Sequence, residues 1–190
     1  MTSLPIVVID CGSKKVETIC SLLRELDCAP EKIPLAEANA TRFEAFRAVI
    51  ISGGPLLFTD PGKTADLEKR FAFISGLQIP TLGICLGHQA LGLVYGAAVF
   101  RGPEIRRPEK INIDRAHPLF EGITSETLFG EDHCEGIFLS EHFLLLASSA
   151  SYEVEAMVAQ DKPFYGVQFH PEISGEPGKK IFQNFIALIP

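Results

Sequence analysis

Short apolar runs without polar alternation, separated by segments of helical periodicity, constrain the fold of this chain more than any other feature. The runs cover residues 6–9, 48–51 and 79–84, and such runs are typical of strands covered on both faces of a parallel sheet. Between them, apolar residues recur at three- and four-residue steps over 16–26 and 67–77, which gives each segment one face to lay on the sheet. This alternation predicts a doubly wound α/β fold with a mostly parallel sheet and flanking helices.

The pattern changes in the second half of the chain. Short runs broken by Gly, Pro and charged residues predict further strands, some of them antiparallel, over 110–114, 143–147 and 154–158. A last strand over 164–169 precedes a helix whose apolar side carries Ile181, Phe182, Phe185, Ile186 and Ile189. In such sheets ligands bind at the carboxyl ends of the strands, so the residues after each strand are the candidates for function.

Length and composition favour one compact enzyme-like domain. The 190 residues contain no linker or repeat, so we expect a single domain over 1–190. A net charge of −7 with scattered Lys and Arg argues against nucleic-acid and membrane surfaces. The start of the chain lacks the pattern of a secretory signal, which predicts a cytoplasmic protein. Five irregularly spaced cysteines fit neither a disulfide framework nor a CxxC metal site, so we expect reduced thiols.

A cysteine between two glycines follows the strand that ends at Ile84. The segment Gly83-Ile84-Cys85-Leu86-Gly87-His88-Gln89 has the G-x-C-x-G form of a nucleophile elbow, in which the glycines permit a sharp turn from strand to helix. A thiol at a helix amino terminus is favoured as the thiolate, the form that attacks a carbonyl carbon. The alternative is a buried structural cysteine, and the pentapeptide alone does not decide between the two.

A histidine and a glutamate follow the last predicted strand. His170 comes directly after it, and Glu172 stands two residues further on. A cysteine nucleophile needs an imidazole as general base and acid, and the imidazole needs a partner that fixes its tautomer. In extended chain the two side chains would lie on one side, with Pro171 stiffening the step between them. A histidine in this position is otherwise an ordinary surface residue.

Paired glycines follow a third strand in Ser52-Gly53-Gly54-Pro55. Without side chains, their N–H groups can point into a site, and with the amide of Leu86 they could bind a tetrahedral oxyanion. The alternative is an ordinary Gly-Gly-Pro turn.

Taken together, the three segments resemble the class I, triad-type glutamine amidotransferases over nearly the whole chain. The resemblance implies a flavodoxin-like amidotransferase fold, a Cys85, His170 and Glu172 triad that forms a glutamyl thioester, and oxyanion donors at Gly54 and Leu86. It also implies that Gln89 and Gly53 help to hold the substrate glutamine. No cofactor or metal is expected for this chemistry. Ammonia would pass to a separate ATP-dependent synthetase subunit, since the chain contains no ATP-binding Gly-rich loop.

Within that family the chain resembles the amidotransferase part of GMP synthases, which aminate XMP. The likeness rests on Ile9-Asp10-Cys11-Gly12-Ser13, Val154-Glu155-Ala156-Met157 and Lys162-Pro163-Phe164-Tyr165. Three departures stand beside it: Lys14, Ile173-Ser174-Gly175, and the segment 129–135, where Asp132 replaces the usual Ser. His133 in that segment is a candidate substrate or partner contact, or else a solvated loop histidine.

Two rival functions use the same residues differently. A stand-alone γ-glutamyl hydrolase would have the same triad and release its product to water. A non-catalytic binding or regulatory module would keep the fold alone.

Overall fold

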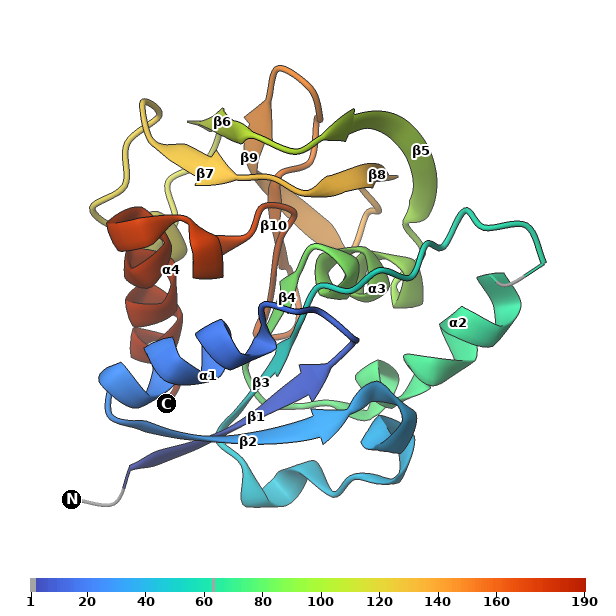
Figure 1. Cartoon of the computed structure of the whole chain (residues 1–190), viewed down its shortest axis with the longest axis vertical. Coiled ribbons are helices and arrows are strands. Elements are labelled where there is room, and N and C mark those ends of the chain that lie inside the picture. Colours follow the sequence, from blue (N-terminus) through green and yellow to red (C-terminus); the bar gives the residue numbers. More distant parts are fainter. Residues whose placement is uncertain (1–2, 63) are drawn as a thin grey trace.

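The computed structural model describes residues 3–62 and 64–190, and its centre is a mixed sheet (Figure 1). In the described part of the chain this sheet has nine strands, in the order β2-β1-β3-β4-β11-β10-β9-β6-β7. The parallel part consists of β1 (Leu4–Asp10), β2 (Cys28–Pro34), β3 (Ala48–Ile51), β4 (Thr81–Ile84) and β11 (Phe164–Val167). The antiparallel part consists of β10 (Ala156–Ala159), β9 (Phe143–Ser149), β6 (Pro108–Ile113) and β7 (Leu128–Gly130). β5 (Ala98–Ile105) and β8 (His133–Phe138) pair as a separate antiparallel ribbon.

Helices cover both faces of the parallel part (Figure 1). α1 (Val16–Glu25) and α4 (Gly175–Ala187) pack on one face, while α2 (Thr64–Arg70) and α3 (Leu86–Val94) pack on the other. Shorter 3₁₀ turns are η1 (Leu35–Ala40), η2 (Phe43–Ala45), η3 (Ala72–Gly76), η4 (Pro118–Phe120) and η5 (Pro171–Ile173). No helix within the described residues is long and apolar enough to cross a bilayer.

The apolar strands are buried on both faces, as their sequences predict. In β1, Ile6 and Val8 pack with α1 and α4, whereas Val7 and Ile9 pack with α2 and α3, and all four are fully buried. Each such side chain contributes roughly 1.5–3 kcal/mol when it leaves water. The doubly wound, mixed sheet is therefore confirmed, with antiparallel strands in the second half.

Two features of the first half differ from the prediction. The helix expected over 67–77 is α2 followed by the 3₁₀ turn η3. Phe71 and Phe73 are both buried, with ring centroids 6.3 Å apart, and residues two apart do not share a face of an α-helix. β2 was not predicted, because it forms the edge of the sheet, where prolines and charged residues are tolerated.

The strands β3, β4 and β11 are neighbours and run parallel. Ile51 of β3 is in register with Gly83 of β4, and Ile84 of β4 is in register with Val167 of β11. Their carboxyl ends therefore bring the three segments singled out above to one edge of the sheet.

Candidate active site

Cys85 lies in a strained turn between β4 and α3. Its backbone has φ 51° and ψ −105°, a conformation that L-residues rarely adopt. The flanking glycines are required, because a Cβ on Gly83 would lie 2.5 Å from the carbonyl oxygen of Gly87, and one on Gly87 would lie 2.3 Å from that of Ile51. The Cys85 N–H donates to the carbonyl of Val167 at 2.9 Å. The turn thus has the geometry of a nucleophile elbow.

His170 and Glu172 form a buried pair beside this turn. Nδ1 of His170 donates to Oε1 of Glu172 at 2.7 Å, and the His170 backbone N–H donates to the Gly130 carbonyl at 2.8 Å. The segment is not extended as predicted: Pro171 begins the 3₁₀ turn η5, which brings the carboxylate back to the imidazole. Ser174 holds this turn in place, since its Oγ donates to the His170 carbonyl at 2.6 Å and accepts from the Gly130 N–H at 2.9 Å.

The cysteine and the histidine meet over Gly53. Burial alone lowers the pKa of His170, but hydrogen bonds with the Cys85 thiol and the Glu172 carboxylate outweigh it and raise this pKa to about 10. A Cβ on Gly53 would lie 2.9 Å from Cε1 of His170 and 3.4 Å from Cβ of Cys85. A glycine is therefore the residue that lets the imidazole approach the thiol.

The backbone amides of Gly54 and Leu86 lie at the ends of the two strands that flank this contact. Gly54 approaches the β1 exit so closely that a Cβ would lie 2.3 Å from the Cys11 carbonyl oxygen. Leu86 is the first residue of α3, where a backbone N–H has no acceptor within the helix. Both residues line the cleft that holds Cys85.

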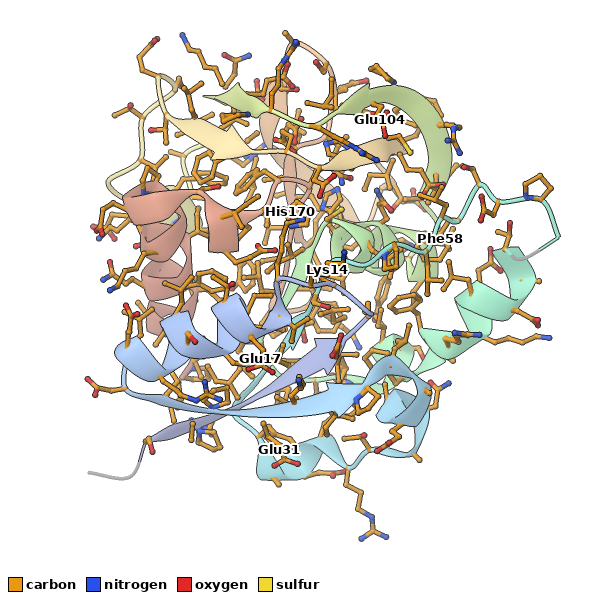
Figure 2. All side chains as sticks on the ribbon, in the orientation of Figure 1. Lys14, Glu17, Glu31, Phe58, Glu104 and His170 are labelled. Atoms are coloured by element: carbon orange, nitrogen blue, oxygen red, sulfur yellow. The ribbon has the colours of Figure 1, made fainter. Side chains whose placement is uncertain are left out.

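A cleft of about 620 Å³ opens over Cys85 and His170. Figure 2 shows His170 near the centre of the molecule, with Lys14 below it and Glu104 of β5 above it, and all three line the cleft. Gln89 lines it from α3, with its amide nitrogen held by the carbonyl of Glu135 at 3.0 Å and by Oε1 of Gln168 at 3.1 Å. The volume suits an amino-acid substrate with room for solvent.

An ion pair that the sequence did not reveal crosses the mouth of the cleft. Nζ of Lys15, in the β1–α1 loop, lies 2.7 Å from Oδ2 of Asp132, and Nε of Arg106 lies 3.7 Å from Oδ1 of the same carboxylate. This pairing lowers the pKa of Asp132, with the Lys15 hydrogen bond as the largest cause. Cys134 and Arg101 also line the cleft.

His133 is not a solvated loop histidine. It begins β8 and its side chain is 2% exposed, with Nδ1 2.9 Å from the Glu135 carbonyl oxygen and Nε2 3.0 Å from Oε2 of Glu131. Both ring nitrogens thus face protein groups, although the residue borders the cleft. Its contact with substrate stays a prediction.

A family profile described as glutamine amidotransferase class-I matches residues 7–188. This chain belongs to the class I glutamine amidotransferase family. The amidotransferase is 35% identical to the glutamine-hydrolyzing subunit of GMP synthase from Pyrococcus furiosus over 187 residues, which cover 95% of this chain and 96% of that protein. It is 34% identical to the protein of the same name from Methanocaldococcus jannaschii, with 95% of each chain covered.

Solved structures of related amidotransferases share this fold. A Thermoplasma acidophilum structure described as a GMP synthase subunit matches with a TM-score of 0.89 at 28% identity, covering 100% of this chain and 95% of that one. A glutamine amidotransferase from Thermotoga maritima matches with a TM-score of 0.77 at 22% identity, covering 98% of this chain and 84% of that one. The second likeness concerns the fold alone.

Proposed function

We propose that this protein is a glutaminase subunit that releases ammonia from glutamine through a thioester on Cys85 and delivers it to a separate ATP-dependent synthetase subunit. The observation that carries the proposal is the junction of Cys85, His170 and Glu172 at the base of an open cleft. The relatives named as glutamine-hydrolyzing subunits of GMP synthase support XMP as the acceptor that the partner aminates. Family membership over residues 7–188 supports a single amidotransferase domain over 1–190.

The first half of the reaction forms the thioester. The Cys85 thiolate attacks the side-chain carbonyl carbon of glutamine, and the oxygen becomes an oxyanion near the amides of Gly54 and Leu86. His170 then donates a proton to the departing nitrogen, so that ammonia leaves as the C–N bond breaks. One oxyanion donor typically lowers such a barrier by about 2.7–4 kcal/mol.

The second half regenerates the enzyme. His170, now neutral, takes a proton from water as the water oxygen attacks the thioester, and the C–S bond breaks to give glutamate and the Cys85 thiolate. Glu172 keeps the Nδ1–H of His170 in place, which leaves Nε2 free for both proton transfers. Gln89 and Gly53 shape the pocket for the glutamine side chain.

Paired assays test this proposal. Glutamate release is measured from the purified protein alone, and then with an ATP-pyrophosphatase subunit, ATP and XMP. We expect slow turnover alone, and stimulation together with GMP formation when the partner is present. Fast turnover that no partner stimulates would identify a stand-alone γ-glutamyl hydrolase, and no turnover under either condition would identify a non-catalytic module.

Covalent labelling tests the nucleophile separately. A glutamine-like diazo-ketone should label Cys85 in preference to the other four cysteines, as shown by peptide mapping. All five are free thiols, which also supports a cytoplasmic location, where thiols stay reduced.

A further inference from the structure

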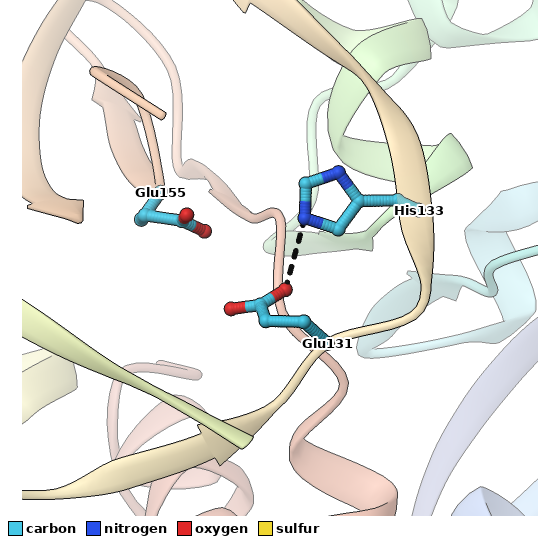
Figure 3. Close-up of side chains that lie close together, drawn as sticks. All are labelled: Glu131, His133 and Glu155. Carbon is cyan, nitrogen blue, oxygen red and sulfur yellow. Dashed lines mark ion pairs between the residues drawn. The ribbon is translucent and has the colours of Figure 1, made fainter. Parts of the chain in front are cut away.

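A second group of ionisable side chains lies behind the cleft. Glu131 follows β7, His133 begins β8, and Glu155 precedes β10, with exposed fractions of 3%, 8% and 0%. Figure 3 shows the two carboxylates and the imidazole facing one another across a small space. One donor atom from each lies within 4.8 Å of the other two. The three residues, which we term the Glu-His-Glu cluster, have no part in the glutaminase mechanism above.

The inward-facing atoms of the Glu-His-Glu cluster have no hydrogen-bond partner in the described part of the chain. This holds for both carboxylate oxygens of Glu131, for Oε2 of Glu155 and for Nε2 of His133. Nε2 of His133 lies 3.0 Å from Oε2 of Glu131, yet the two are not aligned as a hydrogen bond. Buried polar atoms are rarely left this way, because each lost partner costs about 1–3 kcal/mol.

Outer contacts fix the orientation of two of these side chains. Nδ1 of His133 lies 2.9 Å from the Glu135 carbonyl oxygen, which can only accept, so Nδ1 carries the proton and Nε2 presents its lone pair to the cluster. Oε1 of Glu155 accepts from Oγ of Ser149 at 2.7 Å, which leaves Oε2 facing inward. Metal-binding histidines and carboxylates are oriented by outer contacts of this kind.

Tyr152 closes the cluster. Its ring packs on the His133 ring with centroids 4.6 Å apart, and its hydroxyl donates to the Pro103 carbonyl at 2.6 Å. A Cβ on Gly136 would lie 2.5 Å from the Tyr152 ring, so the glycine makes room for this cover.

The charge balance of the cluster calls for a cation or for protons. Among the described residues, neither glutamate forms an ion pair with a lysine or arginine, and Glu109 adds a further carboxylate nearby. Burial is the main cause that raises the pKa of Glu131 and of Glu155 to about 8 each, with His170 and His133 as the opposing positive neighbours. Two carboxylates and a neutral imidazole would balance one divalent cation.

We propose that the Glu-His-Glu cluster binds a divalent transition-metal ion of the Zn²⁺ type, with Nε2 of His133 and one oxygen each from Glu131 and Glu155 as ligands. This set of one nitrogen and two oxygens suits Zn²⁺, whose bonds to such atoms are about 2.0–2.2 Å long. The inward atoms must close slightly around the ion. Glu109, whose Oε2 is also buried without a partner, is the candidate for the fourth position.

The ion would have a structural role in the amidotransferase. The segment from Gly130 to Glu135 holds His170 through the Gly130 carbonyl and Gln89 through the Glu135 carbonyl. An ion on Glu131 and His133 would tie this segment to Glu155 and so keep the catalytic histidine in place.

Metal titration of the stripped protein tests the site. A Cys85→Ala background removes the competing thiol beside His170. After chelation, calorimetry with Zn²⁺ and visible spectroscopy with Co²⁺ should each give one equivalent bound, with a spectrum that lacks a sulfur-to-metal charge-transfer band. Glu155→Gln and Glu131→Gln should each weaken binding at least tenfold, whereas Glu153→Gln, at an exposed position two residues away, should leave it unchanged.

Three results would overturn the site. They are no binding of either metal to the stripped background, equal affinity in Glu131→Gln and Glu153→Gln, and a Co²⁺ spectrum with a sulfur band. Should Glu155→Gln not fold, Glu131→Gln alone decides, with circular dichroism to establish its fold. An infrared band of protonated carboxyls that persists at saturating Zn²⁺ would likewise show that protons, not a metal, neutralise the cluster.

Discussion

The protein contains two buried histidine–glutamate pairs whose surroundings make them opposites. In the pair His170–Glu172, nitrogen and oxygen lie 2.7 Å apart as a hydrogen bond, and contacts with Cys85 and Glu172 raise the pKa of His170 to about 10. In the pair His133–Glu131 they lie 3.0 Å apart without alignment, and burial lowers the pKa of His133. The first pair opens on a cleft, and the second is covered by Tyr152.

This contrast teaches that residue type alone does not determine the role of such a pair. A thiol and an open cleft give His170 a proton to move and a substrate to act on. His133 instead has a second carboxylate and no access to bulk water, which suits a cation. The predictions below act on one pair while leaving the other intact.

Cys85→Ala should have the largest effect, because it removes the nucleophile that makes the first pair catalytic. We expect glutamate release to fall by about 10⁴-fold or more, while the melting temperature stays close to that of the wild type, since alanine keeps the Cβ. A quench-based glutamate assay and thermal unfolding measure both. Glutamate release at the wild-type rate would mean that another residue is the nucleophile.

Glu172→Gln should come next, because the amide no longer holds the Nδ1–H of His170 or favours its positive charge. We expect kcat to fall on the order of 10³-fold to 10⁴-fold, and the pKa of His170, followed by NMR, to move down. An unchanged histidine titration would contradict the assigned hydrogen bond.

Gly53→Ala should displace the His170 ring, since the new Cβ would lie 2.9 Å from Cε1. A shift of this size at a catalytic group lowers kcat by up to about 10²-fold. Gly96→Ala is the control for a glycine change, because no atom lies within 4 Å of its added Cβ, although its positive φ costs some stability. Equal kcat values in the two variants would show that Gly53 is not needed for this approach.

Glu131→Gln should alter the pH dependence of stability in the metal-free protein. Because the pKa of Glu131 is raised from 4.5 to about 8, the folded state holds this proton more tightly than the unfolded state. Its contribution to stability is fully present below about pH 4.5 and is lost as the pH rises through 8. We expect the variant to lose less stability across this window in denaturant titrations, and an identical profile would contradict the buried carboxyl.

Asp132→Ser should have the smallest effect, because its ion pair with Lys15 is partly exposed, with side chains 43% and 25% accessible. Such pairs contribute about 0–1 kcal/mol. We expect a change of a few fold in KM for glutamine, with kcat nearly constant. Steady-state kinetics at low and high salt measure it, and a large drop in kcat would assign Asp132 a role in the chemistry itself.

Much of the first pair and its sheet follows from the sequence, because local signals specify them. The strands β1, β3, β4 and β11 are continuous apolar runs, and the residues after three of them carry Gly53, Cys85 and His170. The glycines at 83 and 87 predict the turn that the structure shows. Neighbouring parallel strands then bring these segments together without any further information.

The second pair was not predicted, because its members meet only through the antiparallel strands. Glu131, His133 and Glu155 come from three segments whose pairing depends on the separate β5–β8 ribbon and on β10. A signal was present in Val154-Glu155-Ala156-Met157, where a glutamate interrupts an apolar run. The edge strand β2 was missed for the opposite reason, since exposure removes the apolar run that marks a buried strand.

The positive φ at position 85 also restricts how this site can change. Backbones in this region accept small unbranched side chains, whereas branching at Cβ adds a clash with the adjoining peptide groups. Serine is therefore the one alternative hydroxyl nucleophile that the turn admits, and threonine is excluded on shape before its reactivity matters. Evolution or engineering of new acyl-transfer chemistry on this scaffold would have to keep the small side chain and vary the cleft around it.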